Sequence, residues 1–247
     1  MKFHTLILEG DKEAEKKAKD AHQPVRSKNE YLRRKKRESL LPLFNRSFYL
    51  CRMIEEELGG IDLDGSGKIT ICAHNIYTYP GEEKYICDSN FHISIYYLEQ
   101  EQIDALDKVA DDGDEAFVIA GVLQDSLLDI ARRNNCTEDV IRKIETAFEH
   151  IIESRFSYEE RIAKLSKRFG NTGLTAHVYR VLSEEQGEGW YVKIADQKGN
   201  VLRKEAIGNG TRYVNRLGSR LYAKAEWRGD TFVIMERFGK VVFSIST

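Results

Sequence analysis

The stretch Phe-His-Ile-Ser-Ile-Tyr-Tyr at residues 91–97, with the sequence that follows it up to residue 134, decides the fold of this chain. Alternation of side chains along residues 91–97 predicts a strand whose two faces meet different surroundings. From residue 99 onward, apolar residues recur every three or four positions, which predicts helices over 99–110, 115–134 and 137–156. A strand that leads directly into helices indicates a sheet with helices packed on it.

Strands are also predicted on both sides of this stretch. Residues 68–77 and 83–87 precede it, and turn-punctuated strands fill the chain after Gly173. We therefore predict an α+β protein with antiparallel sheets backed by helices and a C-terminal β-meander. Residues 1–170 form the mixed helix and strand region, and residues 171–247 form the meander, either as a second domain or as part of the same one.

Composition indicates a soluble globular protein, with 41% hydrophobic and 32% charged residues among 247. No apolar run approaches the 18 or so residues that a membrane-spanning helix needs. The four cysteines form no Cys-x-x-Cys pair, and a chain of this length needs no disulfide for stability. We expect reduced cysteines and a cytoplasmic location.

Charge is distributed unevenly along the chain. Residues 99–115 contain eight Asp or Glu and one Lys, a local excess of seven negative charges. Such a segment favours a basic protein partner through electrostatic complementarity. We expect the contacts to come from its aspartates: Asp104, Asp107, Asp111, Asp112 and Asp114.

Residues 12–37 are the opposite case, with eleven Lys or Arg against four Asp or Glu. Five basic residues stand in succession at its end: Arg33, Arg34, Lys35, Lys36 and Arg37. This run supports an alternative function, nucleic-acid binding by a basic helix over 26–37. On a helix, however, five successive side chains point in all directions and form no single stripe. A solvated helix or a protein contact is therefore favoured over nucleic acid.

The segment Asp-Leu-Asp-Gly-Ser-Gly-Lys at residues 62–68 resembles the start of a calcium-binding loop. Asp62, Asp64 and Ser66 would be its first ligands, but Ala73 stands where a carboxylate must complete the coordination. A glycine-rich turn between a helix and a strand explains the same residues. We expect no metal and no cofactor.

Cys72, His74, Cys87 and His92 are of the residue types that bind zinc, but their spacing is not that of a structural zinc site. His92 and Ser94 also match half of a paired His-x-Ser motif whose second half is missing. A hydrolytic enzyme using Cys72, His74, His92 and Tyr96 is thus a third alternative. The chain lacks Walker, dinucleotide-binding, HExxH and GxSxG motifs, so we predict a non-catalytic protein.

Four stretches together resemble the bacterial immunity proteins that accompany polymorphic secreted toxins. They are residues 91–97, Leu-Leu-Asp-Ile-Ala-Arg at 127–132, residues 192–205, and Ala-Glu-Trp-Arg-Gly-Asp at 225–230. The resemblance covers about residues 85–245 as a pattern of elements. It implies stoichiometric inhibition of a cognate toxin without catalytic residues.

Overall fold

The computed structural model describes residues 5–10, 43–73, 83–88, 90–109, 115–207 and 222–247. It has the predicted α+β composition, with helices, antiparallel strand pairs and a three-stranded C-terminal meander. The chain divides into two compact units, Met1–Phe156 and Ser157–Thr247.

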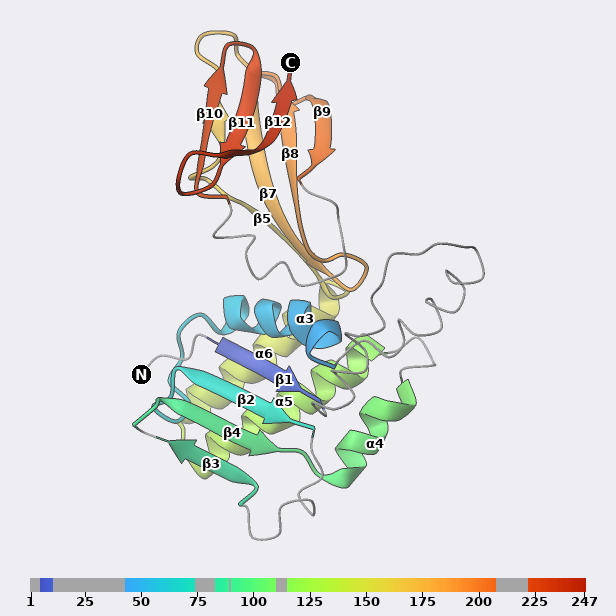
Figure 1. Cartoon of the computed structure of the whole chain (residues 1–247). Coiled ribbons are helices and arrows are strands. Elements are labelled where there is room, and N and C mark those ends of the chain that lie inside the picture. Colours follow the sequence, from blue (N-terminus) through green and yellow to red (C-terminus); the bar gives the residue numbers. More distant parts are fainter. Residues whose placement is uncertain (1–4, 11–42, 74–82, 89, 110–114, 208–221) are drawn as a thin grey trace, which may run out of the picture. The chain divides into compact units, whose positions relative to one another are not determined.

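The first unit contains one sheet and the helices that pack on it (Figure 1). Its elements, in chain order, are β1 (Thr5–Glu9), α3 (Leu43–Leu58), β2 (Lys68–Cys72), β3 (Tyr85–Asp88), β4 (Ile93–Tyr97), α4 (Gln100–Val109), α5 (Glu115–Arg133) and α6 (Glu138–Glu153). The strand order is β1-β2-β4-β3.

This sheet is mixed, whereas the sequence predicted antiparallel pairing. β1 pairs with β2, and β2 with β4, in parallel, and only β3 and β4 form an antiparallel pair. For β1 and β2 the cause is the connection, because a chain that leaves one strand, forms a helix and returns to the same sheet adds the next strand in parallel. α3 lies on such a connection between β1 and β2.

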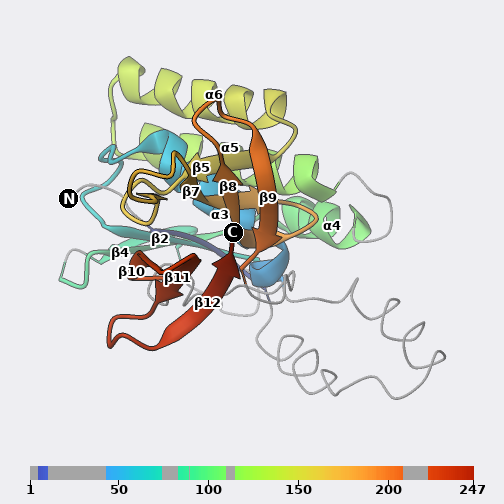
Figure 2. The same cartoon turned by 90° about the horizontal axis from the view of Figure 1, so that it is seen from above.

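The register assigns alternate residues of each strand to the helix-covered face. Leu8, Ile71 and Tyr96 lie side by side across β1, β2 and β4, and all three are buried. Figures 1 and 2 show α5 and α6 along the same side of the sheet. Both helices present buried apolar residues, among them Leu127 of α5 and Phe148 of α6. The core of this unit therefore lies between the sheet and these helices.

The second unit consists of two antiparallel sheets. Its strands are β5 (Ser157–Arg161), β6 (Lys167–Arg168), β7 (Thr175–Ser183), β8 (Gly187–Ala195), β9 (Val201–Ala206), β10 (Lys224–Arg228), β11 (Thr231–Met235) and β12 (Val241–Ser246). One sheet has the order β5-β7-β8-β9, with β6 also paired to β7, and the other is β10-β11-β12. Val178, Trp190 and Val192 from the first sheet share a buried core with Phe232 and Ile245 from the second.

The first residues of this unit precede the expected boundary at residue 170. β5 and β6 both pair with β7, so they complete the second unit's sheet. Trp227 of β10 strengthens this assignment, because its ring stacks on Phe169 at 4.4 Å between centroids and its Nε1 donates to the Lys167 carbonyl at 3.1 Å. The structure thus divides the chain at Phe156, after α6.

Candidate interaction surfaces

The two units carry opposite net charge. Residues 1–156 contain 22 Lys or Arg and 30 Asp or Glu, a net charge of −8, and residues 157–247 contain 16 and 10, a net charge of +6. The two values sum to the −2 of the whole chain. The negative charge of the first unit comes from residues 43–156, which contain 10 basic and 23 acidic residues. A surface of the first unit will therefore attract cationic partners at long range.

The structure describes two of the five aspartates expected to contact a partner. Asp104 and Asp107 lie exposed on α4, and Asp104 Oδ1 accepts a hydrogen bond from Gln100 Nε2 at 2.8 Å. The others, at 111, 112 and 114, lie outside the described residues, as does the basic run at 33–37.

The second face of the mixed sheet has a mainly apolar row at its centre. Ile7, Thr70, Ile95 and Ile86 stand next to one another across β1, β2, β4 and β3. Thr70 is buried at the centre, Ile7 and Ile95 are half-buried, and Ile86 at the edge is 38% exposed. We call these four residues the open-face row. Figure 1 shows α5 and α6 on the opposite side of the sheet from this face.

Charged and aromatic residues border the open-face row. Glu9, Cys72 and Tyr97 form the adjacent row at the carboxyl ends of the parallel strands, and Lys68, Ile93 and Asp88 form the row on the other side. An apolar centre with a polar rim is the composition of many protein–protein interfaces.

The 62–67 loop is a turn between α3 and β2, as the sequence analysis favoured. Asp62 Oδ1 accepts from the Gly65 amide at 2.7 Å, and Asp64 Oδ1 accepts from the Ser66 amide at 2.8 Å. Asp64 Oδ2 accepts from the Tyr85 hydroxyl at 2.7 Å. The carboxylates are thus used to hold the loop, and among the described residues no three or more His, Cys, Asp or Glu side chains are grouped so that they could hold a metal.

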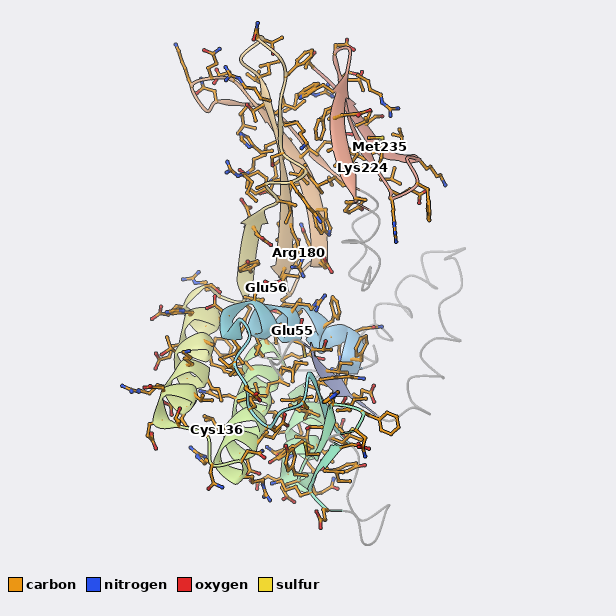
Figure 3. The ribbon with its side chains drawn as sticks, turned by 90° about the vertical axis from the view of Figure 1, so that its left-hand side faces the viewer. Glu55, Glu56, Cys136, Arg180, Lys224 and Met235 are labelled. Atoms are coloured by element: carbon orange, nitrogen blue, oxygen red, sulfur yellow. The ribbon has the colours of Figure 1, made fainter. Side chains whose placement is uncertain are left out.

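A cysteine that the sequence analysis did not single out also holds this loop. Cys136, at the turn between α5 and α6 and labelled in Figure 3, places its Sγ 3.1 Å from the Leu63 carbonyl oxygen. Burial, followed by the nearby charges of Asp62 and Asp64, raises the pKa of this thiol. Cys136 therefore favours the thiol form, which can donate to the carbonyl.

The residues considered for zinc or hydrolysis do not converge. Cys72 lies at the carboxyl end of β2 opposite Tyr97, whereas Cys87 lies on the other side of β4 opposite Ser94. His92 precedes β4 at the opposite end of the sheet, where its carbonyl accepts from the Lys68 amide. His74 is outside the described residues. These positions give no support to a shared site.

Tyr96 belongs to a polar network that joins β4, and Lys84 just before β3, to α5. Its hydroxyl donates to Asp129 Oδ2 at 2.8 Å, and the same oxygen accepts from Arg133 Nε at 2.9 Å. Lys84 Nζ lies 3.8 Å from this oxygen and 3.0 Å from Glu99 Oε1. Two cations and two carboxylates balance one another, so the network carries no net charge.

Its protonation states match a structural role. Burial, more than the hydrogen bond to Asp129, raises the pKa of Tyr96 to about 12. Burial alone would raise the pKa of Asp129, but the hydrogen bonds from Tyr96 and Arg133 outweigh it and the pKa is lowered. At neutral pH the phenol is protonated and the carboxylate is ionised. Neither group is poised for proton transfer, because a general acid or base works best with a pKa near the working pH.

Comparisons with protein-family models, with curated proteins and with solved structures found no match for this chain. Among the described residues, no helix has the length and apolar character required to cross a membrane.

Proposed function

We propose that this protein is a non-catalytic protein-binding inhibitor of the immunity type, which neutralises a basic partner on the first unit. The observation that carries the proposal is the open-face row, Ile7-Thr70-Ile95-Ile86, on an acidic unit. The resemblance to immunity proteins supports a toxin as the class of partner and the bacterial cytoplasm as the place of action. The four cysteines are free, as expected for that compartment.

The geometry of the sheet supports a bound partner on this face. All-parallel sheets are found almost only with both faces covered, because they carry apolar residues on both sides. The parallel part of this mixed sheet also has apolar residues on both faces, since Ile69 and Ile71 of β2 lie on the covered face and Ile93 and Ile95 of β4 lie on the other. A partner that covers the open-face row would bury apolar surface worth about 25 cal/mol per Å².

Electrostatics supports a basic partner. The excess of 13 negative charges over residues 43–156 would raise the association rate of a cationic protein. Asp104 and Asp107, together with the aspartates at 111, 112 and 114, are the proposed contacts. Residues at the rim of an interface mainly change the association rate, whereas residues at its apolar centre mainly change the dissociation rate.

The test uses the full tagged chain to capture its partner from the native host, with nuclease present, followed by binding kinetics with the purified partner. Ile86→Asp places a charge at the exposed edge of the open-face row, and we expect it to raise the dissociation rate. Ile152→Asp on α6 is the matched control, because Ile152 is also an exposed isoleucine, at 40% against 38% for Ile86. Equal effects of the two variants would sink the assignment of the interface to this face.

A second pair of variants tests the charges. Asp104→Lys with Asp107→Lys should slow association and flatten its dependence on salt, because screening acts on the steering charges. Glu149→Lys with Glu153→Lys makes the same change of charge on the exposed surface of α6. If the α6 pair slows association as much as the α4 pair, the net charge alone matters and α4 is not a contact.

A further inference from the structure

The second unit has a sheet face that packs on neither its own core nor the β10-β11-β12 sheet. Along β7, Ala176 and Val178 point to the core and are fully buried, so His177 and Tyr179 point to the opposite face. Along β8, Trp190, Val192 and Ile194 are core residues, which assigns Tyr191 and Lys193 to that opposite face, where Tyr191 is covered by its neighbours and only 7% exposed. We call it the outer face of the second unit.

Register brings basic and aromatic residues together on the outer face. Arg161 of β5, Tyr179 of β7 and Tyr191 of β8 form one row across three strands. His177, Lys193 and Lys204 of β9 form the next row. Glu159 is the nearby acid, one row away on β5.

The lysines are held over the tyrosine rings. Tyr179 and Tyr191 stack with their centroids 5.0 Å apart and an angle of 18° between the rings. Lys193 Nζ lies 4.5 Å from the Tyr179 centroid, and Lys204 Nζ lies 4.3 Å from that of Tyr191. A cation over an aromatic ring is attracted by the electrons of its face, so both ammonium groups are drawn toward the tyrosine pair.

These cations are incompletely neutralised. Lys193 and Lys204 stand directly opposite each other on β8 and β9, a pairing of like charges that costs stability. Lys193 Nζ is 3.5 Å from Glu159 Oε1, but Lys204 makes no ion pair with any carboxylate of the described residues. A bound anion would relieve the repulsion between the two ammonium groups.

His177 lies on the same face, in the row of Lys193 and Lys204. Its Nδ1 is buried and has no hydrogen-bond partner among the described residues. Burial, followed by the charges of Arg161 and Lys193, lowers the pKa of its imidazole.

We propose that the outer face of the second unit binds single-stranded nucleic acid, with Lys193, Lys204 and Arg161 at backbone phosphates and the partly exposed Tyr179 as the aromatic contact to the bases. Proteins that bind single strands without base readout combine basic side chains with aromatic rings in this way. The net charge of +6 on this unit adds the long-range attraction that such binding needs. The site is separate from the open-face row and does not depend on the function proposed for it.

The test measures binding of the full chain to fluorescently labelled 20-nucleotide oligo-dT and oligo-U by anisotropy, from low to physiological salt. We expect binding that weakens with salt on a straight log–log line. For single strands the slope changes by about 0.7 per phosphate contact. Lys193→Gln with Lys204→Gln should therefore flatten the slope by about 1.4.

Arg237→Gln with Lys240→Gln is the matched control, because it removes the same charge from the turn between β11 and β12. We expect this control to leave the salt slope of binding unchanged. Unfolding followed by tryptophan fluorescence shows whether each variant keeps its fold. If both variants lost affinity for the oligonucleotides equally, the proposed site would be overturned. Absence of binding at low salt would overturn it as well. Poly-glutamate that competes as well as the oligonucleotide would assign the face to acidic proteins, and tighter binding of a duplex would exclude a single-strand site.

Discussion

Glu55 on α3 gives the sharpest prediction about stability, because its carboxylate accepts a hydrogen bond from a backbone amide at the edge of the sheet. Glu55 Oε1 accepts from the Leu6 amide of β1 at 2.7 Å, and Oε2 is paired with Arg52. One turn earlier on the same side of α3, the Cys51 sulfur forms hydrogen bonds with the Leu8 amide and the Ser47 hydroxyl. β1 is one of the two edge strands of the sheet that the described residues form, so these side chains take the place of a neighbouring strand as hydrogen-bond acceptors.

The expected cost follows from the geometry. The Glu55 side chain is 8% exposed, so Glu55→Ala removes a charge-assisted hydrogen bond and leaves a poorly solvated amide. Such a loss is worth about 2–4 kcal/mol. Glu55→Gln retains an acceptor for the Leu6 amide and should cost about 1 kcal/mol or less.

The pH dependence has a defined sign. Burial, which outweighs the Leu6 and Arg52 hydrogen bonds, raises the pKa of Glu55 above the 4.5 of an ordinary glutamate. The folded state therefore holds its proton at pH values where the unfolded state has lost it. Stability contributed by Glu55 is complete below pH 4.5 and falls as pH rises through the folded pKa. The advantage of the native chain over Glu55→Gln should shrink across the same range.

Hydrogen exchange of the Leu6 amide measures this directly. Since about 1.4 kcal/mol is a factor of ten, Glu55→Ala should speed exchange by roughly 30- to 700-fold and Glu55→Gln by about fivefold or less. Both tryptophans, Trp190 and Trp227, belong to the second unit, so the unfolding transition seen by their fluorescence should stay in place. Equal exchange rates in the two variants would refute the argument that the carboxylate closes the edge.

Three further predictions use other parts of the structure. Asp129→Asn should lower the free energy of unfolding by about 1 kcal/mol at neutral pH. The difference should vanish as pH falls below 3.8, because the pKa of Asp129 is lowered in the folded state and acid therefore removes the stability that its carboxylate contributes. Urea unfolding followed by circular dichroism measures this difference. Glu188→Ala should destabilise the second unit by about 3–5 kcal/mol in tryptophan-detected unfolding, since the buried Glu188 accepts from Arg180 Nε at 2.9 Å, whereas Glu188→Gln should cost less than half as much. A thiol reagent should modify Cys87 first, because it is exposed, and should reach Cys51 only on unfolding, because burial raises the pKa of that thiol to about 12.

Local patterns in the sequence were sufficient to predict the elements that alternate or repeat clearly. The strand at residues 91–97 is β4, the helices at 115–134 and 137–156 are α5 and α6, and the C-terminal meander is present. Parallel pairing was not predicted, because periodicity within a strand carries no information about which distant strand lies beside it. β5 was missed for a different reason. Ser157–Arg161 is polar and mostly exposed, so it has no apolar face to signal a strand.

The candidate surfaces depended on this long-range information. The open-face row takes one residue from each of four strands that are up to 88 positions apart, Ile7 to Ile95, so no short motif could indicate it. The outer face was closer to prediction, since alternation along β7 and β8 already separates Tyr179 and Lys193 from the core. What the sequence lacked was the register that brings Lys204 opposite Lys193.

The opposite charges of the two units make the two proposals separable in one chain. Lys193→Gln with Lys204→Gln changes the net charge from −2 to −4 and leaves the first unit untouched. If the open-face row binds a basic partner, this variant should associate with it as fast as the native chain or faster, because the added net charge is attractive. The same variant should lose affinity for single-stranded nucleic acid, because the two cations themselves make the contacts. A variant that weakens both interactions would mean that the basic and acidic units serve one shared interface, and the division of function between them would be wrong.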